Sequence, residues 1–185
     1  MTARFDVRIG GLHSIGTDIP SFRPTHLLGI LDPFYPEPTC YDQERSARAM
    51  LLLRFLDVDV ADPDGPAAAH VESIIAFVDE LRVACGRSRP RLLVHCHAGI
   101  SRSTASAYIA LVREMGLDRT AEAFQHLLQV TASPWPNRRL VSLADEALAA
   151  KGRLLAPLDA YRTANRHRLV AMMGAAAGDG SDRSD

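Results

Sequence analysis

One stretch, LLVHCHAGISRST (92–104), constrains the fold of this chain more than any other. Together with Arg91 it begins as a short apolar run, of the kind found in the central strands of parallel sheets. From Ser103 to Met115 the spacing of apolar residues is helical, and Gly116 suits the end of such a helix. The polar and reactive side chains are concentrated in the turn between the two. A buried strand joined to a helix in this way predicts an α/β protein.

The turn between this strand and helix is suited to binding an anion. Backbone N–H groups at a helix start lack partners within the helix, and the helix dipole favours negative charge there. Five residues separate Cys96 from Arg102, and a loop of this length can wrap its N–H groups around a tetrahedral oxyanion. Gly99 permits a backbone conformation that a side chain would hinder. The guanidinium of Arg102 can bind two phosphate oxygens at once.

The same turn favours a nucleophilic cysteine. The thiolate is the nucleophilic form, and a helix N-terminus stabilises it at the position of Cys96. Ser103 directly follows Arg102, and its hydroxyl can hydrogen-bond the sulfur and help it to leave in a second chemical step. We expect His95 to support the loop by hydrogen bonds from inside the sheet, without touching the substrate.

The pattern His95-Cys96-x5-Arg102-Ser103 resembles the signature of the cysteine-based protein tyrosine phosphatases, and over roughly residues 50–150 the chain is similar to their dual-specificity-like, bacterial-type members. The resemblance implies a central, mostly parallel sheet flanked by helices, with the catalytic loop between a central strand and a helix and a helical C-terminal part. It also implies that phosphate is bound by Arg102 and by the inner residues of the pattern, which are His97, Ala98, Gly99, Ile100 and Ser101.

The family mechanism implies a phosphate intermediate on Cys96, which water then hydrolyses. It requires a general acid that protonates the leaving oxygen and afterwards acts as the base toward water. In the family this aspartate lies upstream of the helix that precedes the signature strand, and the matching segment here is ADPDGP (61–66). Asp62 lies nearest the family position, and Asp64 is the alternative.

A further family element lies downstream, in SPWPN (133–137). This segment resembles the Ser-Pro-Asn segment of the family with two residues inserted. The resemblance implies that Asn137 supports the active-site loop from behind. Asn137 also suits the N-cap of the helix that follows, and both roles can hold together.

The remaining chain alternates strand and helix patterns before a run of helices, as α/β proteins do. Two early segments, 5–12 and 25–33, have the spacing of strands. Helical spacing recurs in the segments 70–86, 120–130, 137–152 and 157–173. We expect one phosphatase domain over residues 1–173, with its last helix at about 157–173, and a disordered tail over 174–185.

The segment between residues 42 and 60 has two patterns in succession. The spacing is helical from Asp42 to about Leu53, and RFLDVDV (54–60) alternates as a strand does. Asp57 and Asp59 are then predicted to lie in a strand, which makes them less suitable as the general acid.

Composition bounds the partners and the compartment. With 185 residues, 47% hydrophobic residues and a formal net charge of −1, the chain has an ordinary globular composition that does not favour nucleic acid or a membrane as partner. Three cysteines and no signal-peptide pattern are typical of a cytoplasmic protein. We expect no cofactor and no metal, because the His-Cys-His run at 95–97 offers too few ligands and no second cluster has zinc spacing.

The substrate class follows from the inner residues of the signature, which include no lysine or arginine. Family members that act on phosphoinositides usually place lysines there. We therefore expect a phosphorylated protein or a small phosphomonoester as substrate, with phosphotyrosine favoured and phosphoserine and phosphothreonine accessible to a shallow pocket. Two alternatives remain at this point: a phosphate-binding module without turnover, and a sulfurtransferase of the rhodanese type.

Overall fold

The computed structural model describes residues 3–45, 48–83 and 89–167. Within these ranges a single sheet contains four strands, which are β1 (Asp6–Gly10), β2 (His26–Leu31), β3 (Ala49–Arg54) and β4 (Arg91–His95). Their order is β1-β4-β2-β3, and every neighbouring pair is parallel. The carboxyl ends of the four strands therefore meet at one edge of the sheet, where α/β proteins bind their ligands.

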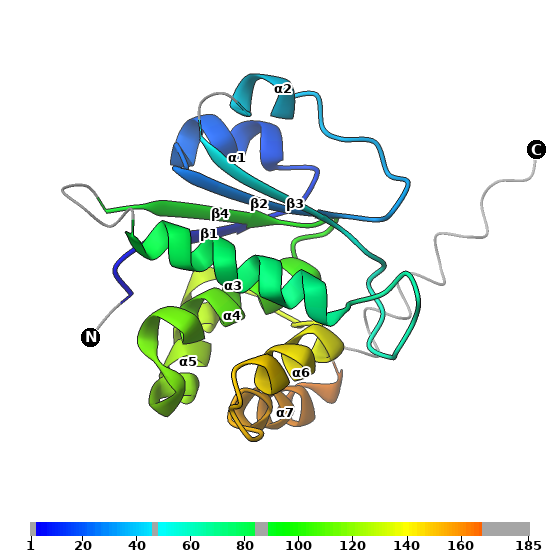
Figure 1. Cartoon of the computed structure of the whole chain (residues 1–185), viewed down its shortest axis with the longest axis vertical. Helices are drawn as coiled ribbons and strands as arrows, with labels where there is room; N and C mark the ends of the chain where they lie inside the picture. Colours follow the sequence, from blue (N-terminus) through cyan, green and yellow to red (C-terminus); the bar gives the residue numbers. More distant parts are fainter. Residues whose placement is uncertain (1–2, 46–47, 84–88, 168–185) are drawn as a thin grey trace, which may run out of the picture.

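Helices cover both faces of the sheet (Figure 1). One face carries α1 (Ile15–Phe22) and α2 (Tyr41–Glu44). The other face carries α3 (Ala68–Val83), α4 (Arg102–Met115), α5 (Thr120–Val130), α6 (Arg138–Ala147) and α7 (Leu155–Ala164), with a 3-10 turn at Leu117–Arg119. None of the helices in the described ranges combines the length and apolar character needed to cross a bilayer. The predicted α/β fold, with a parallel sheet between helices and a helical C-terminal part, is confirmed.

The two central strands are buried on both sides. Every residue of β2 is buried. In β4, Leu93 packs under α1, whereas Leu92 and Val94 face the larger core on the opposite side. This two-sided burial explains why the strand before the signature is wholly apolar and does not alternate with polar residues.

Helix α4 is the central helix of the larger core, and it is buried continuously from Arg102 to Val112. Three alanines, Ala105, Ala107 and Ala110, contribute to this burial. Close packing on all sides restricts the motion of the helix. Its first turn, which carries the signature arginine and serine, is therefore held firmly at the edge of the sheet.

The helix predicted for residues 42–53 is wrong. Only a short helix, Tyr41–Glu44, forms there, and Ala49–Arg54 is a strand. The reason lies in burial on both faces of the strand: Met50 and Leu52 pack on the α1 side, whereas Leu51 and Leu53 pack on the other. A continuous apolar run of this kind fits a helical spacing as well as it fits a buried strand.

The strand predicted for residues 54–60 is wrong as well, because β3 ends at Arg54. Asp57 and Asp59 consequently lie in the loop that joins β3 to α3, the β3–α3 loop (residues 55–67). The alternating pattern reflects a loop whose two carboxylates bind neighbouring elements, as described below.

Several predicted helix ends also shift. The helix predicted from residue 70 begins at Ala68, and its predicted end, including Cys85, lies outside the described residues. Helix α7 begins at Leu155 and ends at Ala164, residues 166–167 are again helical, and the rest of the helix predicted for 157–173 lies outside the described residues. Pro157 stands in its first turn, where a missing N–H costs no hydrogen bond. Residues 168–185, and with them the predicted tail, lie outside the described residues.

Candidate active site

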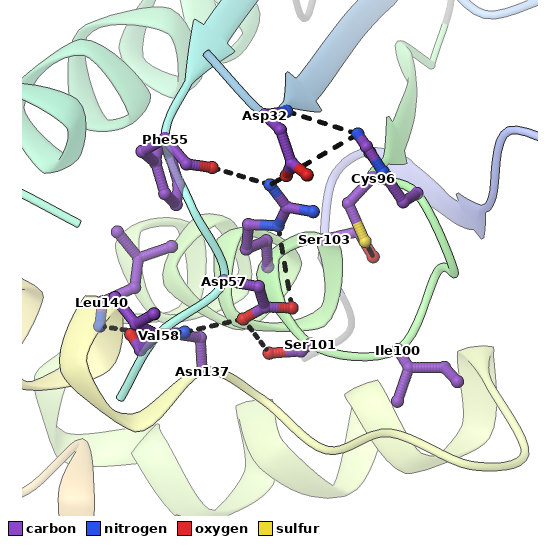
Figure 2. Close-up of polar contacts among 12 residues, drawn as sticks. Asp32, Phe55, Asp57, Val58, Cys96, Ile100, Ser101, Ser103, Asn137 and Leu140 are labelled. Atoms are coloured by element: carbon purple, nitrogen blue, oxygen red, sulfur yellow. Dashed lines mark hydrogen bonds and ion pairs between the residues drawn. The ribbon is translucent and has the colours of Figure 1, made fainter. Parts of the chain in front are cut away.

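The signature loop (residues 96–102) joins the end of β4 to the start of α4, at the ligand-binding edge of the sheet. Cys96 lies beneath it and is only 2% exposed. Its Sγ lies 3.2 Å from the hydroxyl oxygen of Ser103 and accepts a hydrogen bond of 3.3 Å from the backbone N–H of Gly99. The structure thus brings together the cysteine, the serine and the glycine that the sequence singled out. Figure 2 shows the cysteine beside the serine.

The carbonyl groups of the signature loop are bonded to neighbouring segments on its outer side. Leu12 N–H donates to the carbonyl of His97, and Trp135 N–H donates to that of Ile100, over 2.8 and 2.9 Å. Asn137 N–H donates to the carbonyl of Ser101 over 3.2 Å. In a trans peptide the N–H points opposite to the C=O. The N–H groups that follow these three carbonyls therefore point away from the outer partners and are free to face an anion.

Gly99 allows the loop to pass very close to the end of β1. Its φ is +75°, a left-handed conformation, and a Cβ at this position would lie 2.8 Å from the carbonyl oxygen of Gly10. The pair Gly10-Gly11 therefore supports the signature loop from the side. The sequence gives one signal for this role, a double glycine directly after a predicted strand.

Arg102 is buried and held from two sides. Its side chain is 4% exposed, and Nη1 donates to Asp32 Oδ1 and to the carbonyl of Phe55, both at 2.6 Å (Figure 2). The Nε atom is buried and, within the described part of the chain, has no hydrogen-bond partner. It lies 3.6 Å from Asp57 Oδ2, within ion-pair distance. The guanidinium therefore retains a buried donor for an oxyanion.

Asp32, which the sequence analysis did not identify, follows the end of β2 and contacts two residues of the signature loop. Besides pairing with Arg102, its backbone N–H donates to His97 Nε2 over 3.3 Å. This bond requires an unprotonated Nε2. The pKa of His97 is lowered, chiefly because burial disfavours the charged ring, which agrees with that role.

Asp57 also contacts the signature loop, from the β3–α3 loop. Its Oδ1 accepts hydrogen bonds from Ser101 Oγ at 2.6 Å and from Asn137 Nδ2 at 2.8 Å (Figure 2). Asn137 Nδ2 also donates to the carbonyl of Val58 at 3.0 Å, while its Oδ1 accepts from Leu140 N–H at 2.8 Å. Asn137 therefore caps α6 and links the β3–α3 loop to it.

The two aspartates first considered as general acid lie further along the same loop. Asp62 Oδ1 accepts a hydrogen bond of 2.9 Å from the backbone N–H of Asp64, and both residues are exposed. In the described ranges neither carboxylate has a hydrogen bond or ion pair to the signature loop. The structure therefore brings Asp57, and not Asp62 or Asp64, into contact with the signature.

His95 lies inside the sheet, fully buried. Its Nδ1 is 3.4 Å from the carbonyl of Cys96, and its Nε2 hydrogen-bonds the hydroxyl of Tyr41. Burial lowers the pKa of His95 to about 4. A Cβ on Gly29 of β2 would collide with Tyr41 Oη, at 2.3 Å, and with His95 Nε2, at 2.9 Å, so only glycine leaves room for this pair.

Comparison with known proteins finds chains that are similar in sequence and in fold. No family model matches the chain. Over 118 residues it is 30% identical to mouse dual specificity protein phosphatase 15, a match that covers 62% of this chain and 43% of that protein. Over 115 residues it is 31% identical to MAP kinase phosphatase with leucine-rich repeats protein 2 of Dictyostelium discoideum, covering 61% of this chain and 14% of that protein. The matches thus span less than half the length of either relative.

Solved structures agree with the fold. Human DUSP28 superimposes with a TM-score of 0.58 over 78% of this chain and 94% of the compared chain, at 23% sequence identity. This structural likeness shows a shared fold. By its signature and its curated relatives the chain is similar to the dual-specificity members of the cysteine-based protein tyrosine phosphatase superfamily.

Proposed function

We propose that this protein is a phosphatase that hydrolyses phosphotyrosine monoesters through a phosphate intermediate on Cys96. The observation that carries the proposal is the buried pairing of a sulfur with anion donors. Cys96 Sγ lies within hydrogen-bonding distance of Ser103 Oγ and of the Gly99 N–H, and Arg102 Nε, at the end of the same loop, is buried without a hydrogen-bond partner among the described residues. The oxygens of an anion can satisfy buried donors of this kind.

In the first step the Cys96 thiolate attacks phosphorus, and the bond from phosphorus to the ester oxygen breaks. Arg102 Nε and the inward N–H groups of the signature loop bind the phosphoryl oxygens, whose charge increases in the transition state. The leaving oxygen takes a proton from a carboxylic acid. The products of this step are the dephosphorylated alcohol or phenol and a cysteinyl phosphate.

In the second step water attacks the phosphorus of the cysteinyl phosphate, and the sulfur–phosphorus bond breaks. The carboxylate accepts the proton of the water and is restored to the acid. The hydroxyl of Ser103, at 3.2 Å from Cys96 Sγ, donates to the departing thiolate and lowers the cost of forming it. Inorganic phosphate then leaves, and the site is ready for another turnover.

We propose Asp57 as the carboxyl group of both steps. Its Oδ1 is held by Ser101 and Asn137, and the proton is therefore assigned to Oδ2, which lies 3.6 Å from Arg102 Nε. Asp62, favoured from the sequence, or its alternative Asp64 becomes the acid only if the β3–α3 loop moves toward the signature loop when substrate binds. The pH profiles of the aspartate variants, described in the Discussion, decide between these residues.

The proposed substrate is a phosphorylated protein, and small aryl phosphomonoesters are convenient analogues. Two relatives are named as a dual specificity protein phosphatase and a MAP kinase phosphatase, and the names fit a protein substrate. The inner signature residues contain no lysine or arginine, which argues against polyphosphorylated lipids. Phosphoserine and phosphothreonine belong to the proposal as weaker substrates.

Hydrolysis of para-nitrophenyl phosphate tests the proposal. We expect turnover that vanadate inhibits and that Cys96→Ser abolishes, while the variant still binds phosphate because backbone N–H groups supply most of the donors. Binding without turnover in the wild-type chain would instead favour a phosphate-binding module. Transfer of sulfur from thiosulfate to cyanide, without phosphatase activity, would favour a sulfurtransferase of the rhodanese type.

A further inference from the structure

Helix α7 lies beneath α6 at the C-terminal end of the described chain (Figure 1). Its residue Arg162 is 17% exposed, and Nη2 lies 2.6 Å from Asp59 Oδ2. The other oxygen of that carboxylate, Asp59 Oδ1, accepts a hydrogen bond of 2.7 Å from the backbone N–H of Arg138, the first residue of α6. Asp59 therefore fastens the β3–α3 loop to two helices at once.

Arg162 contacts the signature loop through a second residue. Its guanidinium carbon lies 5.1 Å from the centre of the Trp135 ring, a cation–π distance. Trp135 is itself 7% exposed, and its backbone N–H donates to the carbonyl of Ile100 in the signature loop. One side chain of α7 thus touches both the β3–α3 loop and a residue bonded to the signature loop.

The rest of this region holds Arg162 in place. Arg138 makes two parallel hydrogen bonds of 2.8 Å to Asp159, which lies one helical turn before Arg162 in α7. These bonds join α6 to α7. A cavity of about 420 Å³ beside these residues is lined by Asp59, Trp135, Arg138, Asp159, Arg162, Thr163 and Arg166. Arg162 itself is held by its ion pair with Asp59 and by its stacking on Trp135.

We propose that Arg162 is a positioning residue, which sets the distance between Asp57 and the signature loop. The inference rests on the proposed function, in which Asp57 is the proton donor. Asp57 stands two residues before Asp59, so the anchor at Asp59 defines the path of the chain at Asp57. Surface ion pairs contribute about 0–1 kcal/mol to the free energy of unfolding, and in this pair the Asp59 side chain is 43% exposed. Its main effect is therefore expected on the geometry of the loop and not on stability.

The test compares two substrates that differ in how much they need an acid. Phenyl phosphate has a poor leaving group, whereas para-nitrophenyl phosphate has a good one. A proton donor displaced by about 1 Å costs up to roughly a hundredfold in rate. For Arg162→Gln we expect the ratio of kcat for phenyl phosphate to kcat for para-nitrophenyl phosphate to fall about tenfold, with little change in either KM. Arg162→Lys should recover part of the ratio, because it keeps the charge opposite Asp59.

A double-mutant cycle with Asp59→Asn, which changes the exposed partner of Arg162, tests the coupling. In the double variant, Arg162→Gln with Asp59→Asn, the ratio of the two kcat values should fall no further than in either single variant. The matched control is Arg153→Gln, which breaks the exposed pair of Arg153 with Asp118 and should leave the ratio unchanged.

An unchanged ratio in both single variants, with active wild-type enzyme, overturns this inference and leaves the proposed function standing. Equal losses on the two substrates with a lowered Tm also overturn it, since they indicate a structural role. A wild-type chain that hydrolyses neither substrate removes the proposed function and this inference with it.

Discussion

Arg102 Nη1 and Asp32 Oδ1 lie 2.6 Å apart and join the first turn of α4 to the segment that follows β2. Because the guanidinium is planar, holding Nη1 also orients Nε, the donor proposed to bind phosphate. In the same proposal the negative charge of Asp32 repels the phosphate dianion. The balance between orientation and repulsion decides what its removal does.

We predict that orientation dominates, so that Asp32→Ala lowers kcat/KM for para-nitrophenyl phosphate by about 10- to 100-fold, the equivalent of a charge-assisted hydrogen bond. Asp118→Ala, which removes an exposed carboxylate from an ion pair elsewhere, is the control. An increase in kcat/KM for Asp32→Ala would show that repulsion outweighs orientation.

Arg102→Lys should retain the positive charge but lose the planar guanidinium, which can donate two hydrogen bonds side by side. A lysine ammonium cannot donate to Asp32 and to the carbonyl of Phe55 while also reaching two phosphate oxygens. We expect kcat to fall by about 100- to 1000-fold, as when a transition-state donor is removed. Steady-state kinetics measure this loss, and near-wild-type kcat in the lysine variant would contradict the proposed phosphate contact.

Gly99→Ala should disrupt the signature loop through contact as well as conformation. Its φ is positive, and the new Cβ would lie 2.8 Å from the carbonyl oxygen of Gly10, which is backbone and cannot easily yield. We expect a loss of about 2–3 kcal/mol in the free energy of unfolding, together with a lower kcat/KM. Urea denaturation and kinetics measure both.

Gly116→Ala is the matched control for that prediction. Gly116 also has a positive φ, +96°, but a Cβ there meets nothing within 4 Å. It should cost only the conformational part, about 1–3 kcal/mol because ψ is 156° and this backbone region strongly favours glycine, and leave kcat/KM unchanged. Equal effects of the two variants on kcat/KM would argue against the contact of Gly99 with Gly10.

The identity of the acid appears in the pH dependence of kcat for phenyl phosphate. Loss of the acid removes the fall in rate at high pH, because the rate no longer depends on a protonated carboxyl group. We expect Asp57→Asn to flatten this limb, and Asp62→Asn and Asp64→Asn to leave it in place. A flattened limb in Asp62→Asn alone would restore the assignment made from the sequence and would imply that the β3–α3 loop closes over substrate.

His95 should make the fold sensitive to acid. Its pKa is about 4 in the folded chain and about 6.5 when unfolded, so the unfolded state binds more protons between these values. The free energy of unfolding therefore has its full value, as far as His95 is concerned, above pH 6.5. It decreases as the pH falls from 6.5 through 4, by about 3 kcal/mol in all.

Urea denaturation at pH 7, 5.5 and 4.5 measures that effect. His95→Asn should reduce the dependence of the unfolding free energy on pH over this window, whereas His167→Gln, which alters an exposed histidine, should not. The same slope in His95→Asn and wild type would show that other groups cause the acid sensitivity.

Much of the fold followed from local pattern. The strand 91–95, helix α4 and helix α5 were predicted within one residue, since each has a single clear period and a recognisable end. The errors fell on residues 42–60, where apolar side chains serve two cores and acidic side chains serve a binding loop. Neither burial in two cores nor hydrogen bonding from a loop gives the sequence a distinctive spacing of apolar residues.

The signature loop could be read from the amino-acid sequence, because Cys96, Gly99, Arg102 and Ser103 lie within eight consecutive residues and their chemistry depends on the backbone that connects them. Which carboxylates face that loop depends on the tertiary structure. Asp32 is 70 residues from Arg102 in the chain and Asp57 is 44 from Ser101. Their approach depends on β2 and β3 ending at the same edge as β4, and this order arises from the packing of the whole sheet, which no local pattern encodes.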